Sequence, residues 1–219
     1  MARDGDIDGD DGTGRGGHLP YAPLSAADLE ASQADALRDW NRDDPVWVFG
    51  YASLIWSPEL LYEQRVPARV HGYHRRLCLW SIEYRGTPAR PGLVAGLDRG
   101  GSCYGVAYRI SAPAVIEEFA TLWRREMSLG QYEPRWLDGR RLDSGNPLRA
   151  LAFVIRRDAS NYCGRIAETE LVDVLLTASG ARGTNLDYLE QTVAALRAEG
   201  LADPHLERLA ARARAAARE

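Results

Sequence analysis

The chain has 219 residues, of which 45% are hydrophobic and 26% charged, as expected for an ordinary globular protein with one sizeable core. Its formal net charge is −4, and its 27 basic residues, all arginine, are interspersed with 31 acidic residues. Because no basic stripe forms, a nucleic-acid partner is not expected. No apolar run is long enough to cross a bilayer, and the first residues lack the apolar segment of a secretory signal, so no membrane partner and no export are expected.

The cysteines and histidines argue against disulfides and metal sites. Cys78, Cys103 and Cys163 are odd in number and widely spaced, which favours a reducing, cytoplasmic location over a disulfide framework. His71 and His74 lie three residues apart in a predicted strand, where alternation points them to opposite faces. With no cysteine pair nearby to complete a ligand set, the sequence predicts neither a metal nor another cofactor.

The N-terminal region differs in composition from the rest of the chain. Residues 1–20 are rich in Asp and Gly and nearly free of large apolar side chains, so they are predicted to be disordered. Residues 25–40 follow with the pattern of one amphipathic helix capped by Ser25. The predicted organisation is therefore an acidic tail and linker helix over residues 1–44, followed by a folded domain over residues 45–219.

The folded part begins with strands and ends with helices. Runs rich in Val, Tyr, Trp and Leu predict strands at 46–51, 69–80, 92–98, 103–110, 132–137 and 149–156. Apolar periodicity predicts helices at 113–128, 167–179, 185–199 and 204–217, the last of them after an Asp-Pro cap. This order is typical of an α+β fold, here a small curved sheet or partly closed β-barrel with helices packed around it.

The first predicted strand ends in an unusual turn. The chain reads V-W-V-F-G-Y-A-S-L from Val46 to Leu54. Gly50, Ala52 and Ser53 are small, so the turn can present its backbone N–H groups to a carboxylate or a polarised carbonyl. The alternative is an ordinary strand–turn junction. Ser53 has no evident His–Asp pair to activate it, so a hydrogen-bonding role is expected rather than a nucleophilic one.

The predicted helix 113–128 places one carboxylate among apolar side chains. Its apolar arc contains Val115, Ile116, Phe119, Ala120, Leu122, Trp123 and Met127, and its polar side contains Glu117, Glu118, Arg124 and Arg125. Glu126 falls inside the apolar arc, in the last turn, where desolvation and the helix dipole both raise the pKa of a carboxylate. Such a group can act as a base near neutral pH. Alternatively, Glu126 turns out to solvent or pairs with an arginine.

Several blocks of the sequence together resemble the ChaC branch of the γ-glutamylcyclotransferase superfamily. These blocks are F-G-Y-A-S-L-I-W (Phe49–Trp56), G-Y-H-R-R-L-C-L-W-S (Gly72–Ser81), Y-R-G-T-P-A-R-P-G-L-V (Tyr84–Val94), G-V-A-Y-R-I (Gly105–Ile110), W-R-R-E-M (Trp123–Met127) and G-T-N-L-D-Y-L (Gly183–Leu189). They occur in order and cover residues 45–210. The N-terminal 44 residues lie outside the resemblance.

The resemblance implies the γ-glutamylcyclotransferase-like fold and cleavage of glutathione to 5-oxoproline and cysteinylglycine by a lyase. It aligns Glu126 with the family's catalytic acid. It also implies that the turn holds the γ-glutamyl unit, through Val48, Phe49, Gly50, Tyr51, Ala52, Ser53 and Leu54. Arg85, Arg76 and Tyr132 are further candidates for substrate contacts. An arginine can bind a carboxylate through two hydrogen bonds, although surface exposure is the default for each of them.

One residue departs from the family pattern, and two other functions remain open. The family usually has Gly where this chain has Ala52, which would cost roughly 1–2 kcal/mol if the position required a positive φ. The second reading is a cyclotransferase for other γ-glutamyl amines or amino acids, with the same Glu126 and a different leaving-group pocket. A non-enzymatic role as an accessory protein in cation transport is the third reading, which a buried carboxylate disfavours.

Overall fold

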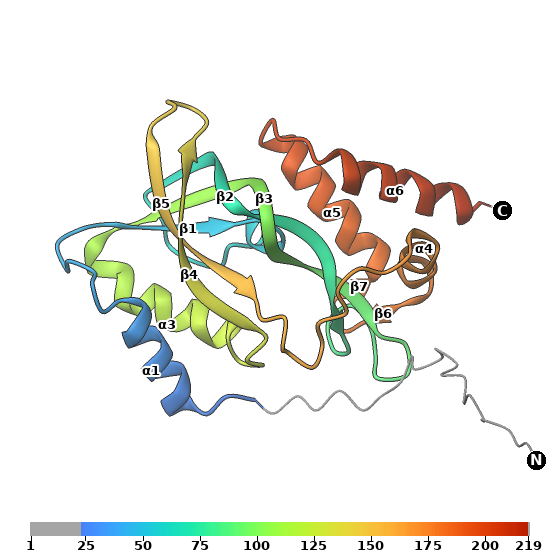
Figure 1. The fold of residues 1–219 in the computed structure, drawn as a ribbon, viewed down its shortest axis with the longest axis horizontal. Coiled ribbons are helices and arrows are strands. Elements are labelled where there is room, and N and C mark those ends of the chain that lie inside the picture. Colours follow the sequence, from blue (N-terminus) through green and yellow to red (C-terminus); the bar gives the residue numbers. More distant parts are fainter. Residues whose placement is uncertain (1–22, 219) are drawn as a thin grey trace, which may run out of the picture.

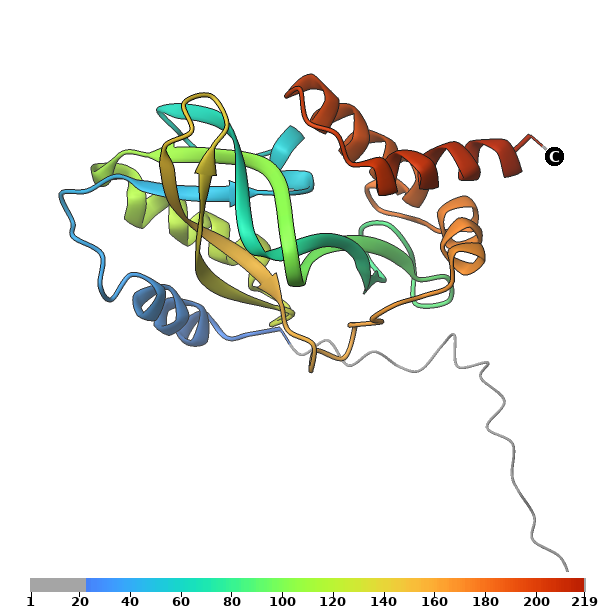
Figure 2. The same ribbon diagram turned by 45° about the horizontal axis from the view of Figure 1, so that its top comes forward.

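A computed structural model describes residues 23–218 of the chain (Figure 1). The disordered tail predicted for residues 1–20 lies outside this range, so that prediction and the domain division at residue 44 stay predictions. The predicted α+β architecture is confirmed. A closed β-barrel has helices α1 and α3 on one side, and helices α4, α5 and α6 gather at its other end (Figures 1 and 2).

The barrel has the strand order β1-β3-β2-β4-β5 and closes through a parallel pairing of β1 with β5. Its strands are β1 (Val46–Gly50), β2 (Gln64–Ser81), β3 (Gly92–Ile110), β4 (Tyr132–Arg141) and β5 (Pro147–Ile155). All other pairings within the barrel are antiparallel. Closure leaves β1 hydrogen-bonded on both sides, so the position where the chain leaves the strand is fixed by the barrel itself.

The predicted strands 92–98 and 103–110 are one strand, β3, and this prediction was wrong at the glycines between them. Gly100 and Gly101 have φ of 102° and 74°, which normally marks a turn. Opposite these two residues stands a single residue of β2, Gly72, where φ is 83°, so β3 carries the extra residue of a β-bulge and the register resumes on both sides of it. Because both strands deviate together, the ladder continues through the glycines. The ribbon of β2 and β3 therefore runs from the barrel out towards the C-terminal helices (Figure 2).

Helix α3 (Val115–Glu126) follows a 3-10 turn at Ala112–Ala114 and buries Phe119 and Trp123 against the barrel. Two details differ from the predicted arcs. Ile116, in the first turn of the helix, is 48% exposed and is not covered by the barrel. Glu118 is buried instead of solvated, and its Oε2 accepts a hydrogen bond of 2.8 Å from the backbone N–H of Leu61.

Helix α1 (Ala26–Ala36) begins at the predicted cap, Ser25, in a complete capping box, and ends four residues before the predicted position. It packs on α3 and β4. Ser32 Oγ accepts a 3.2 Å hydrogen bond from the Trp123 indole, and the carbonyl of Ala36 accepts one of 2.9 Å from Trp136. The helix is therefore part of the packed structure and does not stand apart as a linker.

The C-terminal helices are α4 (Glu168–Thr177), α5 (Asn185–Ala198) and α6 (Pro204–Ala216), with the short hairpin of β6 (Ser179–Gly180) and β7 (Gly183–Thr184) before α5. Helix α5 attaches to the outer part of β3 through side chains. The Asn185 amide binds both the N–H and the C=O of Leu93, at 2.8 and 2.6 Å. The Tyr188 hydroxyl accepts a 3.0 Å bond from the N–H of Ala95. Within residues 23–218, no helix combines the length and apolarity that a membrane span requires.

A shortened chain tests the contribution of α1. We expect removal of residues 1–40 to lower the melting temperature by about 5 °C or more, because the buried Trp123 indole loses its acceptor and part of its cover. An unsatisfied buried donor costs about 1–3 kcal/mol, and each kcal/mol corresponds to about 2–4 °C in a domain of this size. Removal of residues 1–20 keeps α1 and should change the melting temperature by less than about 2 °C. Calorimetry measures both melting temperatures. Equal melting temperatures for the two shortened chains would contradict this expectation.

Candidate active site

A cavity of about 610 Å³ lies where the barrel meets the C-terminal helices. Its walls come from the chain after β1, the far ends of β2 and β3, the end of α3, the start of β4, and the segment around α5. Residues distant in sequence therefore meet in one concave site, as is usual for small-molecule pockets.

Glu126 is the last residue of α3 and lines this cavity. Its side chain is only 14% exposed, and its Oε1 lies 3.0 Å from Nε of Arg125. Burial raises the pKa of the Glu126 carboxyl, and the nearby charge of Glu59 adds to this, while Arg125 and Arg182 oppose it. The carboxylate is inside the cavity, as predicted for a base, and it is also paired with an arginine, as in the alternative prediction.

Arg125 connects Glu126 to the segment after β1. Its Nη1 donates a 2.6 Å hydrogen bond to the carbonyl of Ser57, and its Nη2 donates one of 3.2 Å to Ser53 Oγ. Glu59 lies 3.5 Å from the same guanidinium. Ser53 thus has the hydrogen-bonding role predicted for it, and the guanidinium fixes the carboxylate and the loop relative to each other.

The turn after β1 continues into one helical turn, α2 (Ser53–Trp56), which was not predicted. Ala52 has a φ of −145°, so this position does not require the positive φ that would favour glycine. The condition under which Ala would be costly in place of Gly, a positive φ, is therefore not met. Among the described residues, the N–H groups of Ala52, Ser53 and Leu54 have no hydrogen-bond acceptor, and all three residues line the cavity.

A buried guanidinium holds this turn from behind. Arg75 donates to the carbonyl oxygens of Tyr51 and Tyr104 and forms an ion pair of 2.6 Å with Asp203, the cap of α6. A trans peptide points its C=O and its N–H in opposite directions. Because the Tyr51 carbonyl is held towards Arg75, the N–H of Ala52 in the same peptide points away from Arg75.

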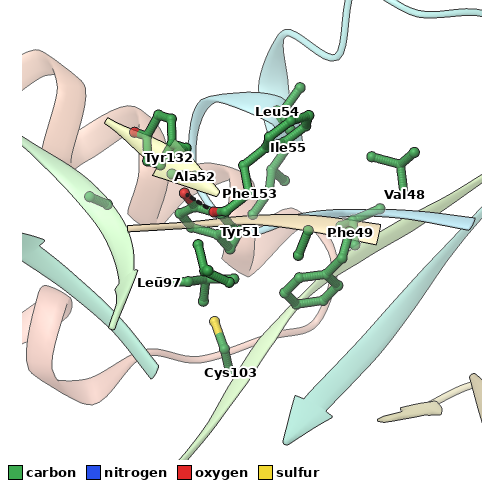
Figure 3. Packing of buried hydrophobic residues seen from close by; sticks show 14 of the residues in the cluster. Val48, Phe49, Tyr51, Ala52, Leu54, Ile55, Leu97, Cys103, Tyr132 and Phe153 are labelled. Atoms are coloured by element: carbon green, nitrogen blue, oxygen red, sulfur yellow. Dashed lines mark hydrogen bonds between the residues drawn. The ribbon is translucent and has the colours of Figure 1, made fainter. Parts of the chain in front are cut away.

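Tyrosine side chains form the floor of the cavity. The Tyr51 hydroxyl donates a 3.0 Å hydrogen bond to the carbonyl of Phe153, and Tyr132 lies beside Ala52 above it (Figure 3). Burial raises the pKa of Tyr51 and Tyr132 well above 10 and that of Tyr188 to about 12. These hydroxyls stay neutral at physiological pH. The Tyr51 proton is already donated to Phe153, whereas the hydroxyl groups of Tyr132 and Tyr188 can still donate to a ligand.

Arg85 is a buried guanidinium that forms no ion pair with the described residues, although the charge of Asp187 acts on it. It lines the cavity, lies 5.3 Å from the ring centre of Tyr188, and donates long hydrogen bonds of 3.4 Å to the carbonyl of Thr184 and to Gln191. Burial lowers its pKa, although an arginine stays charged at neutral pH. A buried cation with weak partners is suited to receive an anionic ligand.

Comparison with known proteins places this site in a family. A family model described as ChaC-like protein matches residues 46–216. The chain belongs to the ChaC-like family. The resemblance found in the sequence blocks is therefore confirmed.

Relatives and solved structures agree with this assignment. The glutathione-specific gamma-glutamylcyclotransferase of Escherichia coli is 36% identical over 167 residues, 75% of this chain and 71% of that protein. Glutathione-specific gamma-glutamylcyclotransferase 1 of Mus musculus is 34% identical over 166 residues, 74% of each chain. The crystal structure of a yeast γ-glutamyl cyclotransferase specific to glutathione has a TM-score of 0.69 at 24% identity, covering 76% of this chain and 94% of that one, and shares the fold.

The structure brings most of the predicted site residues of this ChaC-like chain together. Tyr51, Ala52, Ser53, Leu54, Arg85, Tyr132 and Glu126 line the cavity. Their contact with a substrate stays a prediction. Among residues 23–218 there is no group of three or more His, Cys, Asp or Glu side chains placed to hold a metal ion.

Four predicted substrate contacts are not on the cavity walls, and we withdraw them. Val48 and Phe49 are fully buried on opposite faces of β1, which is paired along both edges. Gly50 is a packing position, where an added Cβ would lie 3.0 Å from Cβ of Leu54. Arg76 pairs at 3.0 Å with the buried carboxylate of Asp98.

Sequence reasoning missed Arg125, Arg182 and Tyr188 as cavity residues. Tyr188 stands in the G-T-N-L-D-Y-L block, so the resemblance carried a signal for it. Arg125 falls on the polar side of the helix pattern, which does not show that a loop 70 residues earlier folds over it. Arg182 lies in the turn of a short hairpin that no periodicity marks.

The ion pair behind the turn generates a stability prediction. Asp203→Asn keeps a good helix cap but removes the charge that faces buried Arg75, so we expect about 1–3 kcal/mol less stability in urea unfolding. Glu190→Gln removes an exposed ion pair with Arg214 and should change stability by less than about 1 kcal/mol. If the two variants unfold at the same urea concentration, the buried pair contributes no more than a surface pair.

Proposed function

We propose that this protein cleaves glutathione by cyclisation of its γ-glutamyl group, releasing 5-oxoproline and cysteinylglycine, with Glu126 as the general base and acid. The observation that carries the proposal is a buried carboxylate of raised pKa that shares a cavity with unpaired backbone N–H groups. The activity named for the Escherichia coli and mouse relatives supports the choice of glutathione.

The reaction needs no nucleophile from the protein. The α-amine of the γ-glutamyl group attacks its own γ-carbonyl, which forms the five-membered ring and breaks the amide bond to cysteine. The amine arrives as an ammonium, so a base must first remove a proton. The departing nitrogen must then gain one. Glu126 accepts the first proton as a carboxylate and, once protonated, donates it to the leaving amine.

The other cavity groups hold the substrate folded for this attack. Arg85 binds the α-carboxylate of the γ-glutamyl group, because it is a buried cation that forms no ion pair within the described chain. The N–H groups of Ala52 and Ser53 point to the oxygen on which negative charge develops as the amine adds. Tyr132 contacts the substrate as a neutral donor. Holding amine and carbonyl together removes several kcal/mol of the barrier.

The structure bears on the alternatives. A related cyclotransferase acting on other γ-glutamyl amines or amino acids would use the same Glu126, so only the leaving-group end of the cavity distinguishes it. Burying the Glu126 carboxylate costs free energy of folding, and a non-enzymatic accessory role does not explain why the chain keeps a buried carboxylate there. We also propose a reducing, cytoplasmic location, because Cys78, Cys103 and Cys163 are free thiols.

The test is formation of 5-oxoproline from glutathione, compared between the natural chain and Glu126→Gln. The amide keeps the shape of the side chain but cannot accept the proton, so we expect turnover to fall about 100- to 10,000-fold. Glutathione binding, measured by calorimetry, should remain. Glu117→Gln, on the exposed face of the same helix, is the control and should keep full activity. More than about a tenth of the natural rate in Glu126→Gln would place the base elsewhere.

The pH dependence of turnover should report the pKa of Glu126. The base is the ionised form, so activity is complete above this pKa and is lost as the pH falls through it. Because burial raises the pKa above its ordinary value of 4.5, we expect the loss to begin at a higher pH than for an exposed glutamate.

Glu59→Gln tests the cause of that shift. It removes a negative charge that raises the pKa of Glu126, so the midpoint of the kcat profile should move to lower pH. Glu117→Gln should leave the midpoint unchanged. A kcat that stays flat below pH 4.5 would contradict the raised pKa.

A further inference from the structure

The rim of the cavity contains an arginine that the proposed chemistry does not use. Arg182 and Tyr84 both line the opening, and both are exposed. They come from segments almost 100 residues apart. The backbone N–H of Arg182 donates a 2.9 Å hydrogen bond to the carbonyl of Tyr84, and that of Ala181 donates one of 2.9 Å to Glu83. The bend at residues 82–85 and the turn of the β6–β7 hairpin are therefore hydrogen-bonded to each other at the rim.

Glycines allow these segments to approach closely. A Cβ added to Gly180 would lie 2.6 Å from the backbone nitrogen of Gly86, closer than any side-chain carbon can come. The position of Arg182 beside Tyr84 is thus fixed by backbone contacts, and does not depend on the choice of side-chain rotamer alone.

The guanidinium of Arg182 is oriented by stacking, while its N–H groups remain without acceptors among the described residues. It lies 4.6 Å from the ring centre of Tyr84, a stacking contact that restricts its plane. Among the described residues its guanidinium makes no hydrogen bond and no ion pair. Its charge lowers the pKa of Glu126 and of Glu59, so its field reaches into the cavity. An oriented arginine with free N–H groups is prepared for bidentate binding of a planar anion.

We propose that Arg182, held on Tyr84, binds the terminal carboxylate of the leaving dipeptide and so determines the preference for the leaving group. The inference rests on the proposed function. If the γ-glutamyl group lies deep against Glu126 and Arg85, the leaving part extends towards the opening. Its terminal carboxylate follows the broken amide by two residues, a span of about 7 Å when extended.

Arg124 is the other exposed cation on the cavity wall, and it offers a matched control. Its Nη2 donates a 3.0 Å hydrogen bond to Thr121 Oγ1 on its own helix, and no described ring stacks on it. The acidic side chain of Glu59 at the rim is held by Ser57 at 2.8 Å and lies near Arg125. Arg182 is therefore the rim cation that is both oriented and unpartnered in the described chain.

The experiment compares two substrates across variants. The substrates are glutathione and its analogue with a C-terminal glycinamide, which lacks only the carboxylate charge. We expect the natural chain to prefer glutathione by about tenfold or more in kcat/KM, as a charge-assisted contact would give. Arg182→Ala should lose that preference by falling about tenfold on glutathione while keeping its rate on the amide. Arg182→Lys should recover part of the preference, and Tyr84→Ala should reduce it.

The outcomes separate this inference from the proposed function. Arg124→Ala should keep the natural preference, and a selective loss there instead of in Arg182→Ala would overturn the assignment. Equal turnover of glutathione and its amide by the natural chain would overturn the inference alone, as would equal losses on both substrates in Arg182→Ala. A natural chain that forms no 5-oxoproline from either substrate would overturn the proposed function itself.

Discussion

The pairing of β1 between β3 and β5 is the constraint on which the site depends. The strand is antiparallel to β3 along its length and parallel to β5 at Val48 and Leu151, which closes the barrel. The chain therefore leaves β1 after Gly50 at a fixed point. The same core receives α3, through the edge contact of Trp123 with Phe153 at 5.2 Å. The turn and the carboxylate at the end of α3 are thus positioned by one packed body.

Buried charges are compensated to different degrees around the cavity. Arg75 has two carbonyls and a carboxylate, so it is a fixed structural cation. Glu126 has one arginine, shared with the loop, and keeps a raised pKa. Arg85 has only weak acceptors in the described chain. Since an uncompensated buried charge is costly, the least compensated groups are the ones that a charged substrate would stabilise.

The sequence predicted the features that depend on local periodicity. The amphipathic pattern of α3 placed Glu126 towards the interior, and the Asp-Pro and Ser caps marked the starts of α6 and α1. The predictions from sequence failed where contacts between distant segments determine the local structure. The glycines of β3 indicated a break, because Gly72, the single residue opposite them in the bulge, lies in another strand. Arg76 was indistinguishable from Arg75 or Arg85, because their partners come from elsewhere in the chain.

The attachment of α5 to β3 has a consequence for association between molecules. The outer part of β3 pairs with β2 on one side only, and its other edge would offer free N–H and C=O groups to a strand of another chain. At Leu93 both groups are taken by the Asn185 amide, which imitates the peptide of a neighbouring strand, and at Ala95 the N–H is taken by Tyr188. A side-chain amide thus ends the sheet. The residues that hold the helix in place also protect the monomer from edge-to-edge aggregation.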